Sequence, residues 1–345
     1  MRVAELIGPR LFRLAETEAP GPQPGEVQVR IQAVGVCGSD MHSYAEGGIG
    51  PTRCSYPMVL GHEPAGVIAR LGAGVSGWQP GDPVACEPAL YCYHCEHCLA
   101  GRHNVCAHLR FLSSPQDPGF FRDYVNLPVR NLLALPSNLD TTEGSLIEPL
   151  SVALHSMKFG QPKPGETAAV FGAGPIGLLT LAILKLSGVS RVWVIEPVAA
   201  RRELARRMGA DAAIDPAAVD AAQQVLADTG NRGVDLVFDC AAKGTSVKQS
   251  IQIARNAGRV VFTGIPPELE TPIEFHAWRR KELALFQVRR SNHEGEQARD
   301  ILAAHAKRFA PLITHTRPLE QIDRAFQQLE SYEDGVGKLV IRIQP

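Results

Sequence analysis

The most informative segment of the chain is TAAVFGAGPIGLLTLAILKLSG, residues 167–188. It opens with a short apolar run that predicts a buried strand, and it continues into a long apolar stretch that predicts a helix. A G-x-G-x-x-G pattern separates the two. Gly172 permits a tight turn, Gly174 lets backbone approach a pyrophosphate, and Gly177 lets the helix pack on the strand. The segment therefore predicts a dinucleotide site.

An acidic residue follows at the expected distance. Glu196 ends the next strand candidate, where its carboxylate can accept hydrogen bonds from both hydroxyls of an adenosine ribose and would repel a 2′-phosphate, which favours NAD over NADP. Arg201 and Arg202 lie close behind, either as contacts of another cofactor or as helix-surface charges. The bland alternative is that the glycines are only turn residues and Glu196 a solvated strand end. The predicted cofactor contacts are Gly172, Gly174, Pro175, Ile176, Gly177, Glu196 and Arg201.

Working outward, the same alternation of strands and helices continues through VWVIEP, ARRELARRMGA, VDLVFDC and RVVFTG, which predicts a parallel sheet. Residues 1–150 instead contain short β-rich runs between glycines and prolines, such as VQVRIQAVGV at 27–36. The final apolar run, GKLVIRI, would complete the sheet of that first part. We expect an α/β protein with a β-rich domain at 1–150, a parallel-sheet domain at 151–290 and a return segment at 291–345.

The composition excludes several classes of function. The 345 residues include 35 Lys and Arg against 36 Asp and Glu, so there is no basic surplus to bind nucleic acid or anionic lipid. The N-terminus lacks a charged start followed by an apolar run, and no stretch approaches 18 apolar residues without charge. We therefore expect neither export nor a membrane, and a cytoplasmic location.

Four cysteines are gathered in one short segment. CYHCEHC at 92–98 and Cys106 form a C-x2-C-x2-C-x7-C arrangement, which suits a closed tetrahedral zinc site with a structural role in a lobe at about 86–110. The predicted ligands are Cys92, Cys95, Cys98 and Cys106. An iron–sulfur cluster and a redox dithiol are the alternatives; disulfides are disfavoured by the reducing compartment expected. Cys54, Cys86 and Cys240 lack ligand-like spacing and are expected to pack in the interior.

A second group of possible ligands is scattered. GVCGSDMH at 35–42 contains Cys37 and His42, GHE at 61–63 contains His62 and Glu63, and IEPL at 147–150 contains Glu148. An open zinc site needs about three such ligands and keeps one position for water or substrate. Each residue alone is ambiguous, and their joint presence carries the prediction. Whether Glu63, Glu148 or water completes the site stays open; Asp40 is expected to fix the loop as a hydrogen-bond acceptor.

Read in order, these motifs resemble the medium-chain zinc-dependent dehydrogenases over essentially the whole chain. The similarity is carried by GVCGSDMH, VLGHEPAG, GDPVACEP, the four-cysteine lobe, EPLSVALH, VFGAGPIG and VVFTGIPP. It is closest to the polyol branch typified by sorbitol dehydrogenase, because simple alcohol dehydrogenases carry a cysteine where Glu148 stands. The resemblance implies a GroES-like catalytic domain, a Rossmann domain, a cleft between them, a catalytic and a structural zinc, NAD, and a homotetramer or less commonly a homodimer.

The resemblance also implies roles for individual residues. Cys37, His62 and Glu63 would bind the catalytic zinc, which acts as a Lewis acid on the substrate hydroxyl, and Glu148 would contact it directly or through water. Ser39 and His42 would pass the hydroxyl proton toward solvent. Substrate contacts would come from Phe111 and Arg289. Two departures from the sorbitol pattern, Tyr44 and Arg290, are expected to alter the substrate site; the second guanidinium would suit a polyol or a sugar acid.

The expected reaction is transfer of a hydride from a secondary alcohol to NAD, giving a ketone. An alternative within catalysis is oxidation of a 3-hydroxy amino acid, as in threonine 3-dehydrogenase, favoured by GIPP at 264–267. Two alternatives from other classes are a zinc- and nucleotide-binding protein without activity, which would require decayed catalytic ligands, and a nucleic-acid-binding zinc ribbon, which the near-neutral charge disfavours.

Overall fold

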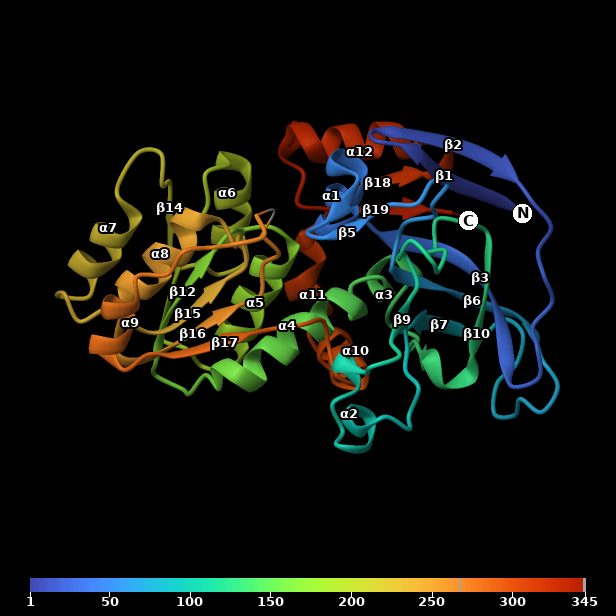
Figure 1. The fold of residues 1–345 in the computed structure, drawn as a ribbon, viewed down its shortest axis with the longest axis horizontal. Coiled ribbons are helices and arrows are strands. Elements are labelled where there is room, and N and C mark those ends of the chain that lie inside the picture. The colour runs from blue at the N-terminus through green and yellow to red at the C-terminus, as the bar shows by residue number, and fades with distance from the viewer. Residues whose placement is uncertain (267, 344–345) are drawn as a thin grey trace. The chain divides into compact units, whose positions relative to one another are not determined.

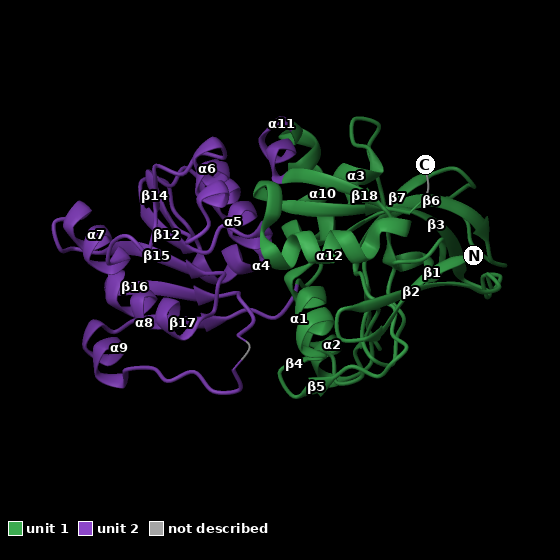
Figure 2. Cartoon of the chain, turned by 90° about the horizontal axis from the view of Figure 1, so that it is seen from above, with its two compact units in different colours: residues 1–151, 291–306, 313–345 green, residues 152–290, 307–312 purple. Residues whose placement is uncertain are grey.

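The computed structural model describes residues 1–266 and 268–343 (Figure 1), which divide into two compact units. Unit 1 comprises residues 1–151, 291–306 and 313–345, and unit 2 comprises residues 152–290 and 307–312 (Figure 2). The predicted α/β class is confirmed, with a β-rich unit and a parallel-sheet unit. Pro267 of the GIPP stretch lies outside the described residues.

The chain passes between the units more often than the sequence suggested. We expected all of 291–345 to return to the first domain, but the short segment 307–312 belongs to unit 2. Phe309 and Leu312 in this segment are fully buried, and burial of these apolar side chains stabilises its packing.

Unit 1 is built on a seven-stranded sheet with the order β11-β7-β6-β3-β19-β18, in which β10 also pairs with β3. Val27, Val29 and Ile31 alternate along β3 and are fully buried, as the period of two in a strand requires. The strands of this sheet are β3 (Glu26–Gly35), β6 (Glu63–Leu71), β7 (Pro83–Cys86), β10 (Tyr124–Pro128), β11 (Leu132–Ala134), β18 (Ile313–Pro318) and β19 (Lys338–Arg342).

The remaining strands of unit 1 form short pairs. They are β1 (Arg2–Gly8) with β2 (Leu11–Glu16), β4 (Gly48–Ile49) with β5 (Thr52–Arg53), and β8 (Ala89–Leu90) with β9 (Arg110–Phe111). Its helices include α1 (Gly38–Glu46), α2 (Glu96–Leu99), α3 (Thr141–Gly144), α10 (Gly295–Ala304) and α12 (Ile322–Ser331), while α4 (Ile147–Gly160) and α11 (Ala306–Phe309) each run from one unit into the other.

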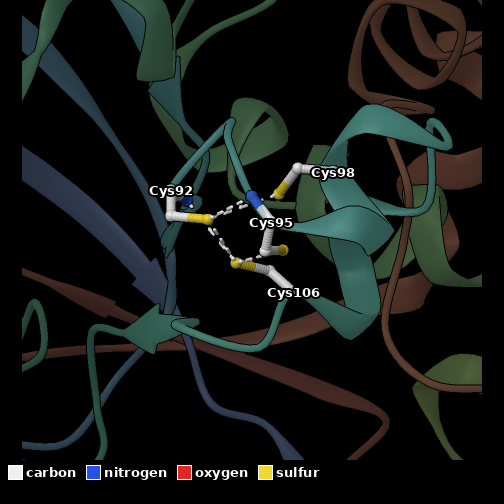
Figure 3. Close-up of side chains that lie close together, drawn as sticks. All are labelled: Cys92, Cys95, Cys98 and Cys106. Atoms are coloured by element: carbon white, nitrogen blue, oxygen red, sulfur yellow. Dashed lines mark hydrogen bonds between the residues drawn. The ribbon is translucent and has the colours of Figure 1, made fainter.

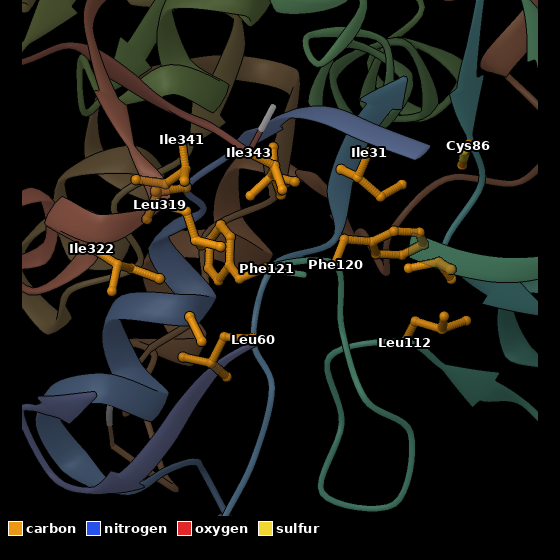
Figure 4. Packing of buried hydrophobic residues seen from close by; sticks show 14 of the residues in the cluster. Ile31, Leu60, Cys86, Leu112, Phe120, Phe121, Leu319, Ile322, Ile341 and Ile343 are labelled. Atoms are coloured by element: carbon orange, nitrogen blue, oxygen red, sulfur yellow. The ribbon is translucent and has the colours of Figure 1, made fainter. Parts of the chain in front are cut away.

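The core of unit 1 joins segments that are far apart in the sequence. Side chains from β3, from β19 and from the loops around Leu60 and Phe121 pack together (Figure 4). Helix α12 closes one side of this core, because Ile322, Phe326 and Leu329 recur at helical spacing and are buried. Strand β19 pairs with β3 on one side and with β18 on the other, so a strand from the last part of the chain lies inside the sheet that earlier residues begin.

Unit 2 is a six-stranded parallel sheet with the order β14-β13-β12-β15-β16-β17, the strand order of a dinucleotide-binding fold. Its strands are β12 (Thr167–Phe171), β13 (Arg191–Ile195), β14 (Ala212–Ile214), β15 (Val234–Asp239), β16 (Ala254–Phe262) and β17 (Ala284–Gln287). Its helices are α5 (Pro175–Leu186), α6 (Ala199–Arg207), α7 (Ala221–Asp228), α8 (Gly244–Ile253) and α9 (Phe275–Lys281).

Candidate metal centres and cofactor site

The four cysteines of the lobe converge on one point (Figure 3). Cys95 caps the N-terminus of α2, Cys98 lies within that helix, and Cys106 follows a 3₁₀ turn at His103–Val105. All four sulfur atoms lie within 4.8 Å of one another, and none of the four cysteines is in a disulfide. The arrangement brings together every ligand that the spacing predicted.

The sulfur geometry fits a zinc ion. The Sγ atoms of Cys92 and Cys98 are 3.9 Å apart, those of Cys95 and Cys106 are 3.9 Å apart, and those of Cys92 and Cys106 are 3.4 Å apart. Zinc–sulfur bonds of about 2.3 Å in a tetrahedron place the sulfurs about 3.8 Å from one another. Backbone N–H groups also donate to the sulfurs, among them Cys95 N to Cys92 Sγ at 3.3 Å. Such donors stabilise the thiolate form, which is the form that binds metal.

The lobe is fastened by the return segment, which sequence reasoning did not indicate. Asn292 Oδ1 accepts a hydrogen bond from His103 N at 3.0 Å, and Asn292 Nδ2 donates to Gly101 O at 2.9 Å. His103 of the lobe is half-buried, with its ring 4.5 Å from that of His293 and 5.5 Å from that of Tyr91.

A second group of ligands lies where β3 and β6 run side by side. Cys37 follows β3 and caps helix α1, and His62 and Glu63 stand at the start of β6. Gly35 pairs with Glu63 in the antiparallel ladder, so residues on either side of this pair are close in space. The possible ligand atoms of Cys37, His62 and Glu63 all lie within 4.8 Å of one another. Thiolate, imidazole and carboxylate form the three-ligand donor set of an open zinc site.

Asp40 orients the imidazole. Its Oδ1 lies 3.3 Å from His62 Nδ1, and its carboxylate also accepts from Cys37 N at 3.0 Å and Gly61 N at 3.2 Å. The prediction that Asp40 fixes this loop as an acceptor is confirmed. Because Nδ1 faces Asp40, Nε2 is the nitrogen that a metal can use. Burial lowers the pKa of His62, but the negative charges of Asp40 and Cys37 outweigh it, and the pKa is raised well above its ordinary value.

A lysine completes the surroundings of Glu63. Lys338, from β19, is fully buried; its Nζ forms an ion pair with Glu63 Oε2 and donates to Val36 O at 2.9 Å. Gly35 leaves room for this pair, since a Cβ there would lie 2.0 Å from Glu63 Oε2 and 2.7 Å from Lys338 Cε. We did not predict Lys338 as a site residue, although a lysine inside the apolar run GKLVIRI was a usable signal.

Replacing Lys338 by methionine is expected to lower the free energy of unfolding by about 3 kcal/mol, because Glu63 would keep a buried charge without its partner. Urea denaturation measures this loss. The matched control is Lys248→Met at an exposed position of α8, which should leave stability nearly unchanged. The double variant Glu63→Gln with Lys338→Met should recover part of the loss. A single Lys338 variant as stable as the wild type would show that the ion pair does not hold this corner together.

Glu148 lies outside the three-ligand group. It stands in the first turn of α4, and its oxygen atoms are not among those within 4.8 Å of Cys37, His62 and Glu63. Burial raises the pKa of Glu148 to about 8, with a lowering contribution from the charge of His62 and a raising one from Glu63. The carboxyl group is thus electrostatically coupled to the ligands without joining them, an arrangement suited to contact through water.

Ser39 and His42, the two residues of the expected proton path, make different contacts. Ser39 Oγ lies 3.4 Å from His62 Nε2. His42, further along α1, has its Nδ1 3.1 Å from Glu46 Oε1, one turn later in the same helix. Ser39 therefore faces the group of ligands, whereas the contact shown for His42 runs along the helix toward Glu46.

The predicted substrate residues separate into different environments. The ring centroid of Phe111 lies 5.3 Å from that of His62, which places an apolar wall beside the ligands. Tyr44 is a correction: only 1% of it is exposed, and it packs on Phe12 and Phe326 in the core. The physical reason is helical spacing, because Tyr44 lies four positions after the buried Asp40 and shares its face of α1.

Arg289 and Arg290 end the 152–290 segment of unit 2, whereas Phe111 and the ligands belong to unit 1. Arg289 is exposed. Arg290 is half-buried and has a left-handed backbone, with φ of 54°. Their contact with substrate stays a prediction.

The glycine-rich loop adopts the geometry that its sequence predicts. Gly172 has φ of 90°, and a Cβ on Gly177 would lie 1.9 Å from Gly172 O. A Cβ on Gly174, which caps α5, would meet nothing within 4 Å, so the space in front of this helix N-terminus is open. Pro175 follows as the first helical residue. A pyrophosphate fits this cradle, because the unpaired N–H groups of the helix end favour an anion.

Glu196 lies beside this loop. It follows β13, only 4% of it is exposed, and its carboxylate accepts from Ala173 N at 2.7 Å and Val198 N at 2.9 Å. The same carboxylate that could bind a ribose is therefore held in place by backbone on both sides. This geometry fits a dinucleotide with free ribose hydroxyls.

Comparisons with known proteins agree with these sites. Residues 23–137 match the family model of the alcohol dehydrogenase GroES-like domain, and residues 175–304 match that of zinc-binding dehydrogenases. A 2-dehydro-3-deoxy-L-galactonate 5-dehydrogenase of Pseudoalteromonas atlantica is 35% identical, over 99% of this chain and 98% of its own length. A sorbitol dehydrogenase of Bacillus subtilis is 30% identical, over 99% and 97% respectively.

A solved structure of a Sinorhizobium meliloti protein described as a zinc-binding dehydrogenase, bound to NADP, has a TM-score of 0.92, with 29% identity and 99% of both chains covered. Among residues 1–266 and 268–343, none of the helices combines the length and the apolar character needed to cross a membrane. The motifs, the two ligand groups and the full-length similarity lead to one conclusion. The chain belongs to the zinc-dependent medium-chain dehydrogenase family, in the branch that contains sorbitol dehydrogenase.

Proposed function

We propose that this protein oxidises a secondary alcohol of a polyol or sugar acid to a ketone, with NAD as hydride acceptor. The observation that carries the proposal is the group formed by Cys37, His62 and Glu63, with Phe111 beside it. A zinc ion held there supplies a Lewis acid that lowers the pKa of the substrate hydroxyl. NAD supplies the acceptor for the hydride that leaves the same carbon.

The chain's own residues supply positioning and proton transfer. Asp40 sets the orientation of His62, and Lys338 holds Glu63 through an ion pair. Phe111 limits water beside the reacting carbon. Ser39, which lies 3.4 Å from His62 Nε2, relays the hydroxyl proton: its Oγ accepts that proton as it gives up its own, which passes by way of His42 to solvent. Glu148 adds a carboxyl group that contacts the metal directly or through water.

The remaining roles follow from the family. The four-cysteine lobe holds a second, structural zinc, and the cradle formed by the glycine-rich loop and Glu196 binds NAD, with Ile176 and Arg201 as further contacts. Arg289 and Arg290 contact the hydroxyls or carboxylate of the substrate, in keeping with relatives named for a sugar acid and for sorbitol. The same resemblance supports a homotetramer, or a homodimer, in the cytoplasm.

The test is a panel of substrates with NAD, followed by the absorbance of NADH, on a sample whose zinc content is measured. The panel contains sorbitol, xylitol, L-iditol, galactitol, L-idonate, L-threonine and ethanol. We expect turnover with at least one polyol or sugar acid, with about two zinc ions per chain. Turnover confined to L-threonine would replace the proposal by its amino-acid alternative. Inactivity toward the whole panel in fully zinc-loaded protein would overturn the substrate class.

A further inference from the structure

The loop that follows Glu196 is braced by an arginine. Arg202, in the first turn of α6, donates from Nη1 to Glu196 O at 2.8 Å and to Pro197 O at 2.6 Å. Its Nη2 forms an ion pair with Asp215 Oδ2 at 2.8 Å. Only 14% of the Arg202 side chain is exposed. The guanidinium group therefore donates hydrogen bonds to two carbonyl groups and pairs with one carboxylate.

Asp215 is itself held in position. It follows β14, next in the sheet to β13, which Glu196 follows. Its Oδ1 accepts from Ala217 N at 2.9 Å, and its backbone carbonyl accepts from the N–H groups of Ala218 and Val219. The carboxyl ends of neighbouring parallel strands thus present two carboxylates, Glu196 and Asp215, with Arg202 between them. In this fold the ribose of the cofactor's adenosine half binds at the end of the second strand.

We propose that Asp215 determines cofactor choice by holding Arg202, and so excludes dinucleotides that carry a 2′-phosphate. The inference rests on the proposed binding of NAD at Glu196. A 2′-phosphate brings a charge of about −1.5 to −2 and needs cationic donors in place of carboxylates. Arg202 is bonded to the backbone carbonyl of Glu196, and its ion pair with Asp215 withholds its charge from a phosphate. The site therefore discriminates through repulsion as well as attraction.

Removing the Asp215 charge weakens the repulsion of a 2′-phosphate and also frees Arg202 to attract it. In Asp215→Asn a neutral amide replaces the carboxylate, and Arg202 Nη2 becomes available to a phosphate oxygen. A single charge-assisted hydrogen bond supplies about a tenfold gain in affinity. The ribose hydroxyls of NAD still meet Glu196, so binding of the unphosphorylated dinucleotide should change little. The ratio of the two affinities therefore changes because the 2′-phosphorylated dinucleotide binds more tightly, while the affinity for NAD stays the same.

The experiment measures binding without turnover. ADP-ribose and its 2′-phosphate are titrated calorimetrically into the wild type, Asp215→Asn, Arg202→Met and the double variant. We expect Asp215→Asn to bind the 2′-phosphate ligand about tenfold more tightly than the wild type, with ADP-ribose affinity unchanged within about threefold. In the Arg202→Met background the same Asp215 change should give a much smaller gain, because only the repulsion is removed there, so the two substitutions are non-additive.

Asp211→Asn is the matched control. Asp211 stands at the other end of β14, where its Oδ2 accepts from Val192 N at 2.7 Å and pairs with Lys185 Nζ at 2.9 Å. It removes the same charge from the same strand, and we expect an unchanged ratio of the two affinities. Two outcomes would overturn the inference, because each would show that only the net charge matters. One is tighter binding of the 2′-phosphate ligand by Asp211→Asn, and the other is an equal increase in that affinity from Asp215→Asn with and without Arg202.

The two proposals fail in different ways. A wild-type protein that does not bind ADP-ribose contradicts the proposed NAD site itself. A protein that binds ADP-ribose in all variants, with no change in 2′-phosphate affinity in Asp215→Asn, leaves the NAD site standing and removes the role of Asp215. Since ADP-ribose binding requires an intact glycine-rich loop, it also reports that each variant is folded.

Discussion

Serine in place of Cys37 is expected to abolish turnover and to lower the zinc content by one ion per chain. The thiolate is one of three protein ligands, and an open site that keeps only His62 and Glu63 has too few to retain the metal. Loss of Lewis-acid assistance removes several kcal/mol of transition-state stabilisation; about 4 kcal/mol corresponds to a roughly 1,000-fold lower rate. Steady-state kinetics and metal analysis on the same sample measure both effects.

Cys54→Ser is the control for this variant. Cys54 is also half-buried, its Sγ lies 3.7 Å from Ser43 O, and it belongs to neither group of ligands. The control should retain both zinc ions and its activity. ADP-ribose affinity should be unchanged in both variants, because the glycine-rich loop belongs to unit 2 and does not use Cys37. An active Cys37→Ser enzyme with full zinc content would refute the catalytic site.

Cys106→Ser is expected to remove the other zinc ion and to lower Tm by about 10 °C or more, because a site that holds the lobe together contributes directly to folding. Cys106 is buried, its sulfur lies 3.4 Å from that of Cys92, and the N–H of His108 donates to it at 3.4 Å. Without it the lobe keeps three sulfurs around an incomplete shell. Differential scanning calorimetry with metal analysis measures the change.

The same sample distinguishes the alternative metals. A zinc-loaded protein without visible absorption excludes an iron–sulfur cluster, whereas a coloured protein that contains iron would replace the zinc assignment. Cys54→Ser again serves as the control and should melt close to the wild type. If Cys106→Ser kept two zinc ions and the wild-type Tm, the lobe would not depend on this ligand. Activity is a separate readout, since the catalytic ligands lie in a different group.

Several features could be predicted from the sequence because they are made by residues that are close along the chain. The cysteines at 92, 95 and 98 lie within two turns of backbone, so their spacing alone brings the sulfurs together. The glycine-rich loop is similar. Gly172, Gly174 and Gly177 lie close together between the end of β12 and the first turn of α5, and the conformation they permit is local. For such segments the pattern of residue types is enough to predict the local structure.

Sequence reasoning placed other residues correctly only through family resemblance. Cys37 and His62 are brought together because β3 pairs with β6, a contact that residue spacing does not reveal. Tyr44 shows the limit of the method. Its position in a motif suggested a substrate contact, but the face of α1 on which it lies is buried by Phe12 and Phe326. Which face of a short helix is buried depends on the elements packed against it.

The class of fold, the ligands of the lobe and the dinucleotide loop were therefore determined by the order of residues alone, since short-range geometry and hydrophobic periodicity suffice for them. Only the tertiary structure decided the surroundings of Glu63 and Glu196. Lys338 reaches Glu63 because β19 enters the sheet beside β3, and Asp215 reaches Arg202 because β14 lies next to β13. Glu63 and Lys338 are distant in sequence, whereas Arg202 and Asp215 belong to successive elements; both ion pairs depend on how their elements pack together. Such pairs depend on strand order and side-chain direction, which exist only once the chain has folded.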